Sequence, residues 1–159
     1  MSWLSGPKNK FMDQLEDFCN RCEVMHLIHR KFRSLSGGEK QRVLFVRALL
    51  QVSSQRPSDG SSQYLFLDEP TSNLDIAHEL TLLSVCRERA GEGFGVVIVL
   101  HDLNLASRFA DSILLLQEGK LRAVGRPEEV LDGNVLSSLY GTDIVVENNK
   151  TVGRLVIHS

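Results

Sequence analysis

The chain has 159 residues, of which 42% are apolar and 24% charged, and its formal net charge is −2 at pH 7. This is the balance of an ordinary globular protein with a sizeable core, and the near-neutral charge argues against a nucleic-acid partner. The longest apolar run, Val96 to Leu100, is far shorter than the roughly 20 residues that a membrane-spanning helix needs. We expect neither a bilayer-crossing segment nor a secretion signal.

Helices are predicted in the first third of the chain. Apolar spacing predicts an amphipathic helix from Phe11 to about Met25 and a second helix from Glu39 onward, with Ser36 as its cap. The apolar face of the second helix is predicted at Val43, Val46 and Leu50. Residues 53–62, which are rich in Ser, Pro and Gly, predict an exposed loop.

Two short apolar runs predict buried parallel strands. Tyr64 to Leu67 ends in Asp68-Glu69-Pro70, and Val96 to Leu100 ends in His101-Asp102. A helix that stops near Gly91 is predicted between them. Strands that alternate with helices indicate an α/β fold with a parallel sheet, and the ligands of such sheets bind beyond the carboxyl ends of the strands.

The last third of the chain is predicted to hold shorter elements. They are a helix that ends near Ala110, hairpin strands over 113–116 and 121–124, a helix that begins at Pro127, another that ends near Leu139, and an edge strand over 144–157.

Three cysteines are present, and Cys19 and Cys22 form a C-x-x-C pair. An odd, sparse count favours a reducing compartment over a disulfide scaffold. Cys22 follows Leu15 and Phe18 at helical spacing, and no second pair completes a zinc site. We interpret the cysteines, Cys86 included, as small buried hydrophobes, with metal or redox chemistry as the alternative.

The acidic strand end carries the strongest chemical signal. Mg²⁺ accepts one or two protein carboxylates and keeps several waters, which makes Asp68 the metal candidate. Glu69 points elsewhere, since side chains diverge along a strand, and could hold an attacking water as general base. Taken alone, the pair would more often simply close a strand before the turn at Pro70.

Two further features indicate phosphate chemistry. Ser36-Gly37-Gly38 precedes a helix, where glycines allow close backbone approach and the helix N-terminus favours an anion. The alternative is an ordinary helix cap. His101, at a strand end, can donate a hydrogen bond to a phosphate, although a single histidine there is more often structural.

Four segments, in order along the chain, resemble motifs of the ABC ATPases. They are Leu35 to Gln41 (the signature, with Glu39 where many members carry Gln), Tyr64 to Glu69 (Walker B), Ser72 to Asp75 (the D-loop) and Val97 to Asp102 (the switch strand with its histidine). The likeness covers Phe11 to about Tyr140. On these motifs the chain is identified as a member of the ABC transporter ATP-binding subunits, from their C-terminal portion.

The resemblance implies an α/β fold: a partial P-loop NTPase-type parallel sheet flanked by helices, with part of the ABC helical subdomain. Residues 1–52 would hold part of that subdomain and the signature helix, and 53–159 the C-terminal part of the ATPase core. The implied cofactors are ATP and Mg²⁺. The implied roles are catalysis for Glu69 and His101, metal binding for Asp68, and nucleotide binding for Ser36, Gly37, Gly38, Gln41 and Asp75.

The resemblance also implies partners. Two ATPase subunits would pair head-to-tail as a homodimer, so that Ser36 and Gly38 serve the partner's nucleotide. The dimer would bind an integral membrane permease at the cytoplasmic face of the inner membrane, and a periplasmic binding protein only indirectly. Closure on ATP and opening after hydrolysis would move the permease.

One family motif is missing. A phosphate-binding loop needs Gly-x-x-x-x-Gly-Lys-Ser/Thr, and the Gly-Lys pair of this chain, Gly119-Lys120, is followed by Leu121. We therefore expect the chain alone not to bind ATP tightly. It would be a piece of a longer subunit, a truncated product or a part complemented by another chain.

The stretches Val99 to Ala106 and Gly125 to Leu131 are typical of importers for iron complexes, haem and vitamin B12. The insertion Gln51 to Gln63 and the segment Asp75 to His78 resemble the haem importer ATPases most, and the tail Gly153 to Ile157 resembles the cobalamin importers. The cargo itself is bound elsewhere, so residue chemistry does not identify it. A non-transport ABC protein or an inactive remnant is the alternative, although no coiled coil of the repair type is present.

Overall fold

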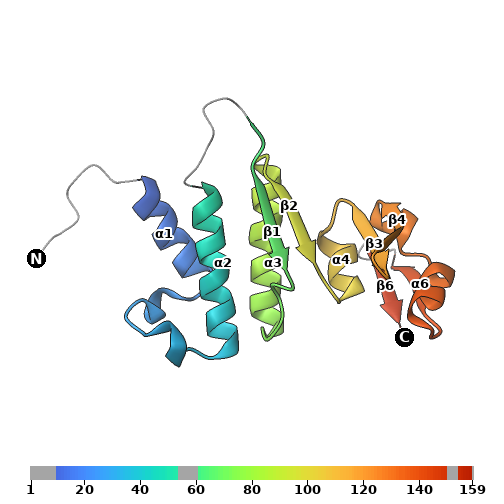
Figure 1. The fold of residues 1–159 in the computed structure, drawn as a ribbon, viewed down its shortest axis with the longest axis horizontal. Coiled ribbons are helices and arrows are strands. Elements are labelled where there is room, and N and C mark those ends of the chain that lie inside the picture. Colours follow the sequence, from blue (N-terminus) through green and yellow to red (C-terminus); the bar gives the residue numbers. More distant parts are fainter. Residues whose placement is uncertain (1–9, 54–60, 150–153, 159) are drawn as a thin grey trace, which may run out of the picture. The chain divides into compact units, whose positions relative to one another are not determined.

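The computed structural model describes residues 10–53, 61–149 and 154–158 (Figure 1). Most of the loop predicted over 53–62 lies outside the described residues. The chain divides into two compact units, the first ending at Val99 and the second beginning at Leu100. The predicted division into 1–52 and 53–159 concerns a different boundary and stays a prediction.

The first unit contains α1 (Lys10–Arg21), α2 (Gly37–Ser53), α3 (Ile76–Gly91), β1 (Tyr64–Asp68) and β2 (Gly95–Val99), with two 3-10 turns, η1 (Met25–Leu27) and η2 (Phe32–Ser34), between α1 and α2. The first predicted helix is too long at its carboxyl end. α1 ends at Arg21 instead of near Met25, because Glu23 has a left-handed φ of 52° that a right-handed helix does not accommodate.

β1 and β2 pair in parallel, which confirms the predicted parallel strands. α2 packs against β1 and α3 against β2, and Leu65 is accordingly buried. The prediction that both strands are buried is wrong for the sheet face opposite to Leu65. That face, here called the open sheet face, exposes Tyr64 by 59%, Phe66 by 72%, Val97 by 46% and Val99 by 49%.

The core of the first unit draws on all three helices. Among its most deeply buried side chains are Phe18, Leu49, Leu83 and Val85. The predicted apolar face of α2 is shifted, since Phe45, Val46 and Leu49 are buried while Val43 and Leu50 are half-buried. The Arg21 guanidinium also reaches the Glu88 carboxylate at 2.8 Å and so joins α1 to α3.

The second unit contains α4 (Leu103–Phe109), β3 (Ile113–Gln117), β4 (Lys120–Gly125), α5 (Pro127–Val130), α6 (Gly133–Tyr140), β5 (Val145–Asn149) and β6 (Arg154–His158). The predicted hairpin is confirmed: β3 and β4 are antiparallel, and Glu118 and Gly119 turn the chain with φ of 50° and 72°, as a tight hairpin loop requires. The predicted single edge strand is instead an antiparallel pair, β5 and β6.

A separate apolar cluster stabilises the second unit. Its buried members are Ile113, Leu115, Val130, Leu131, Leu136 and Ile144. Because successive strand residues point to opposite faces, Leu114 and Leu116 of β3 are 60% and 65% exposed. None of the described helices of either unit is both long and apolar enough to cross a membrane.

Candidate functional site

The turn that follows β1 is hydrogen-bonded to the second turn of α2. Glu69 has a left-handed backbone, with φ of 45°, which costs a non-glycine residue roughly 1–2 kcal/mol. Its carbonyl oxygen accepts hydrogen bonds from Gln41 Nε2 at 3.2 Å and from the N–H and Oγ of Ser72 at 3.2 and 2.9 Å. Three donors therefore hold Glu69 in this conformation, and one of them comes from α2.

Ser36 caps α2, as predicted. Its Oγ accepts a hydrogen bond from the Glu39 N–H at 3.2 Å, and its own N–H donates to Glu39 Oε2 at 2.8 Å, which is a capping box. The hydrogen bond from the Ser36 N–H lowers the pKa of the Glu39 carboxyl. The N–H groups of Gly37 and Gly38 lie in the first turn of α2, where the helix offers them no carbonyl.

Acidification should weaken this cap. Because the pKa of Glu39 is lowered in the folded chain, its contribution to stability is complete above the ordinary pKa and is lost as the pH falls through the lowered value. We expect Glu39→Gln to remove this part of the pH dependence, since the amide keeps the acceptor without the charge. Denaturant unfolding of both proteins from neutral pH down to about pH 3 would measure it. Equal pH dependence in the two proteins would contradict the assignment.

The glycines that follow Ser36 lie against the D-loop. A Cβ on Gly38 would stand 2.8 Å from the Asn73 carbonyl oxygen, closer than side chains tolerate, whereas a Cβ on Gly37 would meet Asn73 Cβ at an ordinary 3.6 Å. Asn73 itself has a left-handed φ of 64°, which Asn tolerates better than most residues. The start of α2 and the loop 69–75 are therefore in close backbone contact at this position.

We predict that Gly38→Ala destabilises the chain and Gly37→Ala does not. The first substitution drives a methyl group into backbone, which costs about 1–3 kcal/mol. The second fills available space and, by favouring the helical conformation, stabilises by up to about 1 kcal/mol. Denaturant unfolding of the two variants measures the difference. Equal stabilities would show that α2 and the D-loop are not packed as described.

Asp68 is the last residue of β1 and is exposed. It pairs with Val99, so β1 and β2 end at the same edge of the sheet. Among the described residues, no group of three His, Cys, Asp or Glu side chains could hold a metal ion. A single exposed carboxylate at a strand end, as Asp68 provides, is of the kind that Mg²⁺ accepts, since this cation takes one or two carboxylates and completes its shell with phosphate and water oxygens.

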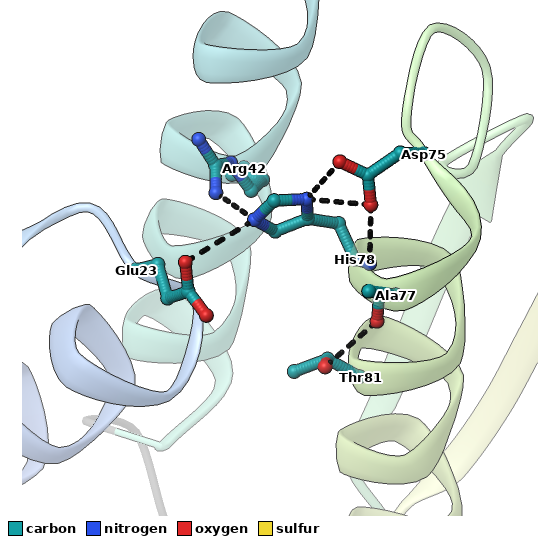
Figure 2. A network of polar contacts seen from close by, with 6 residues as sticks. All are labelled: Glu23, Arg42, Asp75, Ala77, His78 and Thr81. Carbon is teal, nitrogen blue, oxygen red and sulfur yellow. Dashed lines mark hydrogen bonds and ion pairs between the residues drawn. The ribbon is translucent and has the colours of Figure 1, made fainter.

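Asp75 caps α3 and is bonded to a histidine. Its Oδ1 accepts from the His78 N–H at 2.9 Å, and both carboxylate oxygens lie 2.8 Å from His78 Nδ1. These contacts, the backbone N–H of His78 first, lower the pKa of Asp75. The second ring nitrogen of His78 contacts Arg42 of α2 (Figure 2). Neither His78 nor Arg42 is among the predicted site residues, although a histidine three residues after a capping Asp is a recognisable signal.

His101 belongs to the second unit, where it is exposed. The next residue, Asp102, caps α4 by accepting hydrogen bonds from the N–H groups of Asn104 and Leu105 at 2.7 and 3.0 Å. The Asn104 side chain in turn exchanges two hydrogen bonds with the backbone of Ile157 in β6, at 3.2 and 2.9 Å. The chain next to His101 is therefore held by a helix cap and by a strand.

All three cysteines are free and buried, as the sequence predicts. Burial raises the pKa of the Cys22 thiol to about 11 and that of Cys86 to about 12, and it also raises the pKa of Cys19. Thiols with such values are protonated at neutral pH and react slowly. The three cysteines therefore serve as small apolar side chains in the core.

The packing of these elements is shared with known proteins. The structure resembles a metal-chelate type ABC transporter in an inward-facing conformation, with a TM-score of 0.72 and 26% identity over 99% of this chain and 60% of that one. No family model matches the chain. Two similar sequences are hemin import ATP-binding proteins HmuV, from Aliivibrio fischeri (42% identity over 84% of this chain) and Escherichia coli O157:H7 (47% over 79%).

A parallel strand pair that ends in two carboxylates, packed beside a capped Ser-Gly-Gly helix start, is the arrangement of an ABC-type ATPase of the P-loop NTPase fold. The chain belongs to the ATP-binding subunits of ABC transporters, and among them it is similar to the hemin import ATP-binding proteins. It spans about half the length of these relatives, 50% of the first and 48% of the second.

Proposed function

We propose that this chain forms the signature-bearing part of the ATP-hydrolysing subunit of a haem or iron-complex ABC importer, which couples ATP hydrolysis to import. The observation that carries the proposal is the 42–47% identity to hemin import ATP-binding proteins, over most of this chain. The active form would be a homodimer of such subunits, bound to an integral membrane permease at the cytoplasmic face of the inner membrane. Its closure and opening would drive the conformational change of the permease. A periplasmic binding protein would supply the cargo and contact this subunit only indirectly.

The residues have distinct proposed roles at the nucleotide. Mg²⁺, when bound, would neutralise phosphate charge, and Asp68 would hold it through a bound water. Glu69 would accept the proton of the attacking water. His101 would donate a hydrogen bond to the γ-phosphate. Ser36, Gly37 and Gly38 would present the N-terminus of α2 to the phosphates of the partner's nucleotide. Gln41 and Asp75 would position the loops next to that nucleotide.

The open sheet face supports the view that this chain works within a larger ATPase domain. Tyr64, Phe66, Val97 and Val99 form an exposed apolar surface on one side of β1 and β2, and apolar patches of this kind usually mark an interface. Sheets made of parallel strands are normally covered on both faces. We propose that the part of the domain that carries the P-loop covers this face.

The test joins this chain to the P-loop-bearing remainder of a hemin import ATP-binding relative, and we call this chimera the completed subunit. Reconstituted in proteoliposomes with a haem, a cobalamin or a siderophore permease in turn, the completed subunit should hydrolyse ATP and drive uptake with the haem permease. Uptake with the cobalamin permease alone would reassign the cargo. ATP hydrolysis that no permease or cargo influences would indicate a non-transport ABC protein.

A further inference from the structure

A polar network joins three segments of the first unit at His78 (Figure 2). His78 lies in the first turn of α3, and its side chain is 23% exposed. Arg42 reaches it from α2, Glu23 from the bend after α1, and Asp75 from the end of the D-loop. Figure 2 shows the imidazole between the Arg42 guanidinium on one side and the Asp75 carboxylate on the other.

The two ring nitrogens of His78 contact different elements. Nδ1 lies 2.8 Å from each carboxylate oxygen of Asp75, so Nδ1 carries a hydrogen that it donates. Nε2 faces Nη1 of Arg42, and because a guanidinium only donates, Nε2 accepts. With its hydrogen on Nδ1, the ring links Arg42 of α2 to Asp75 of the D-loop.

The guanidinium of Arg42 is only partly satisfied by hydrogen bonds. Its Nε is buried and has no hydrogen-bond partner among the residues that the structure describes, and a buried donor without a partner costs about 1–3 kcal/mol. Glu23 lies 3.5 Å from His78 Nε2 with a side chain that is 72% exposed. A proton on Nε2 would turn that nitrogen into a donor, which repels Arg42 and favours Glu23.

His78 completes a series of attachments between α2 and the loop 69–75. Gly38 packs on Asn73, and Gln41 donates to the Glu69 carbonyl. The contact of Arg42 with His78 follows one residue further along α2. We infer that His78 is a positioning residue, which through its two ring nitrogens fixes the D-loop Asp75 relative to α2. The inference rests on the proposed function for its effect on ATP hydrolysis, whereas the linkage itself is a property of this chain.

The test compares two substitutions at His78 with a neighbouring control. His78→Phe keeps the ring shape and removes both nitrogens. His78→Gln keeps a donor and an acceptor on one side chain and does not titrate. Thr81→Val is the control, because the Thr81 hydroxyl bonds the Ala77 carbonyl of its own helix. In the 159-residue chain, two-bond ¹H–¹⁵N correlation spectra should show the Nδ1–H tautomer of His78, and the amide shifts of the 69–75 loop should move in His78→Phe but not in Thr81→Val.

In the completed subunit, His78→Phe should lower kcat for ATP hydrolysis by about tenfold to a hundredfold, the loss expected for a displaced catalytic loop, with ATP affinity unchanged. His78→Gln should restore most of kcat, because its amide supplies both a donor and an acceptor. An Nε2–H tautomer, or unchanged kcat in His78→Phe, would overturn the inference. A completed subunit that never hydrolyses ATP, with the tautomer and the shifts as expected, would refute the proposed function and leave the linkage standing.

Discussion

Glu69→Gln in the completed subunit should slow ATP hydrolysis by about 10²–10⁴-fold, the usual contribution of a general base, and should leave ATP binding intact. In the proposed site Asp68 would hold the metal and Glu69 the attacking water, so the amide would remove the proton acceptor. Gln also preserves the side chain's length, and the backbone contacts that hold Glu69 come from its carbonyl oxygen, which the substitution does not change.

Single-turnover hydrolysis and ATP affinity, measured on the same preparation, separate the two effects. The matched control is Glu118→Gln. Glu118 is also an exposed acidic residue with a left-handed backbone, at φ of 50° against 45° for Glu69, but it turns the β3–β4 hairpin. Undiminished turnover in Glu69→Gln, or an equal loss in both variants, would remove Glu69 as the base.

Local sequence signals predicted the elements whose causes are themselves local. The cap at Ser36 follows from a serine three residues before Glu39. The hairpin follows from Glu118-Gly119 between two apolar runs. The parallel pair follows from strands that alternate with a helix. For the cap and the hairpin, the residues that determine the structure lie within a few positions of one another, whereas the strand pair joins Tyr64 to Gly95 across a helix.

The errors have causes that the apolar pattern does not show. Apolar spacing continues past Arg21, but the helix stops because Glu23 turns into the left-handed region, which no helical periodicity reveals. The link between Arg42 and His78 spans 36 residues, so only the tertiary fold brings the two together. The burial of Phe66 was predicted from the apolar run alone, whereas its exposure in this chain depends on which elements are present to cover it.

Because Phe66 lies on the open sheet face, Phe66→Asp should prevent the completed subunit from forming an active, monodisperse ATPase. If the P-loop-bearing part covers the open sheet face, the substitution forfeits about 1.5–3 kcal/mol of apolar burial and places a carboxylate in a packed interface, at a cost of several kcal/mol. The sum is comparable to the whole stability of a typical domain, about 5–15 kcal/mol. Size-exclusion chromatography, thermal unfolding and ATPase activity would measure the loss.

Phe32→Asp is the control. From the exposed fractions in this chain alone, Phe32→Asp should destabilise the protein more than Phe66→Asp does. Phe66 is 72% exposed and Phe32 only 45%, so a surface that stays open would make Phe66→Asp the milder change. Coverage of β1 and β2 by the rest of the ATPase domain reverses that order, since only Phe66 would then be buried on completion. A completed subunit that tolerates Phe66→Asp as well as Phe32→Asp would show that the open sheet face stays exposed and that the missing P-loop part packs elsewhere.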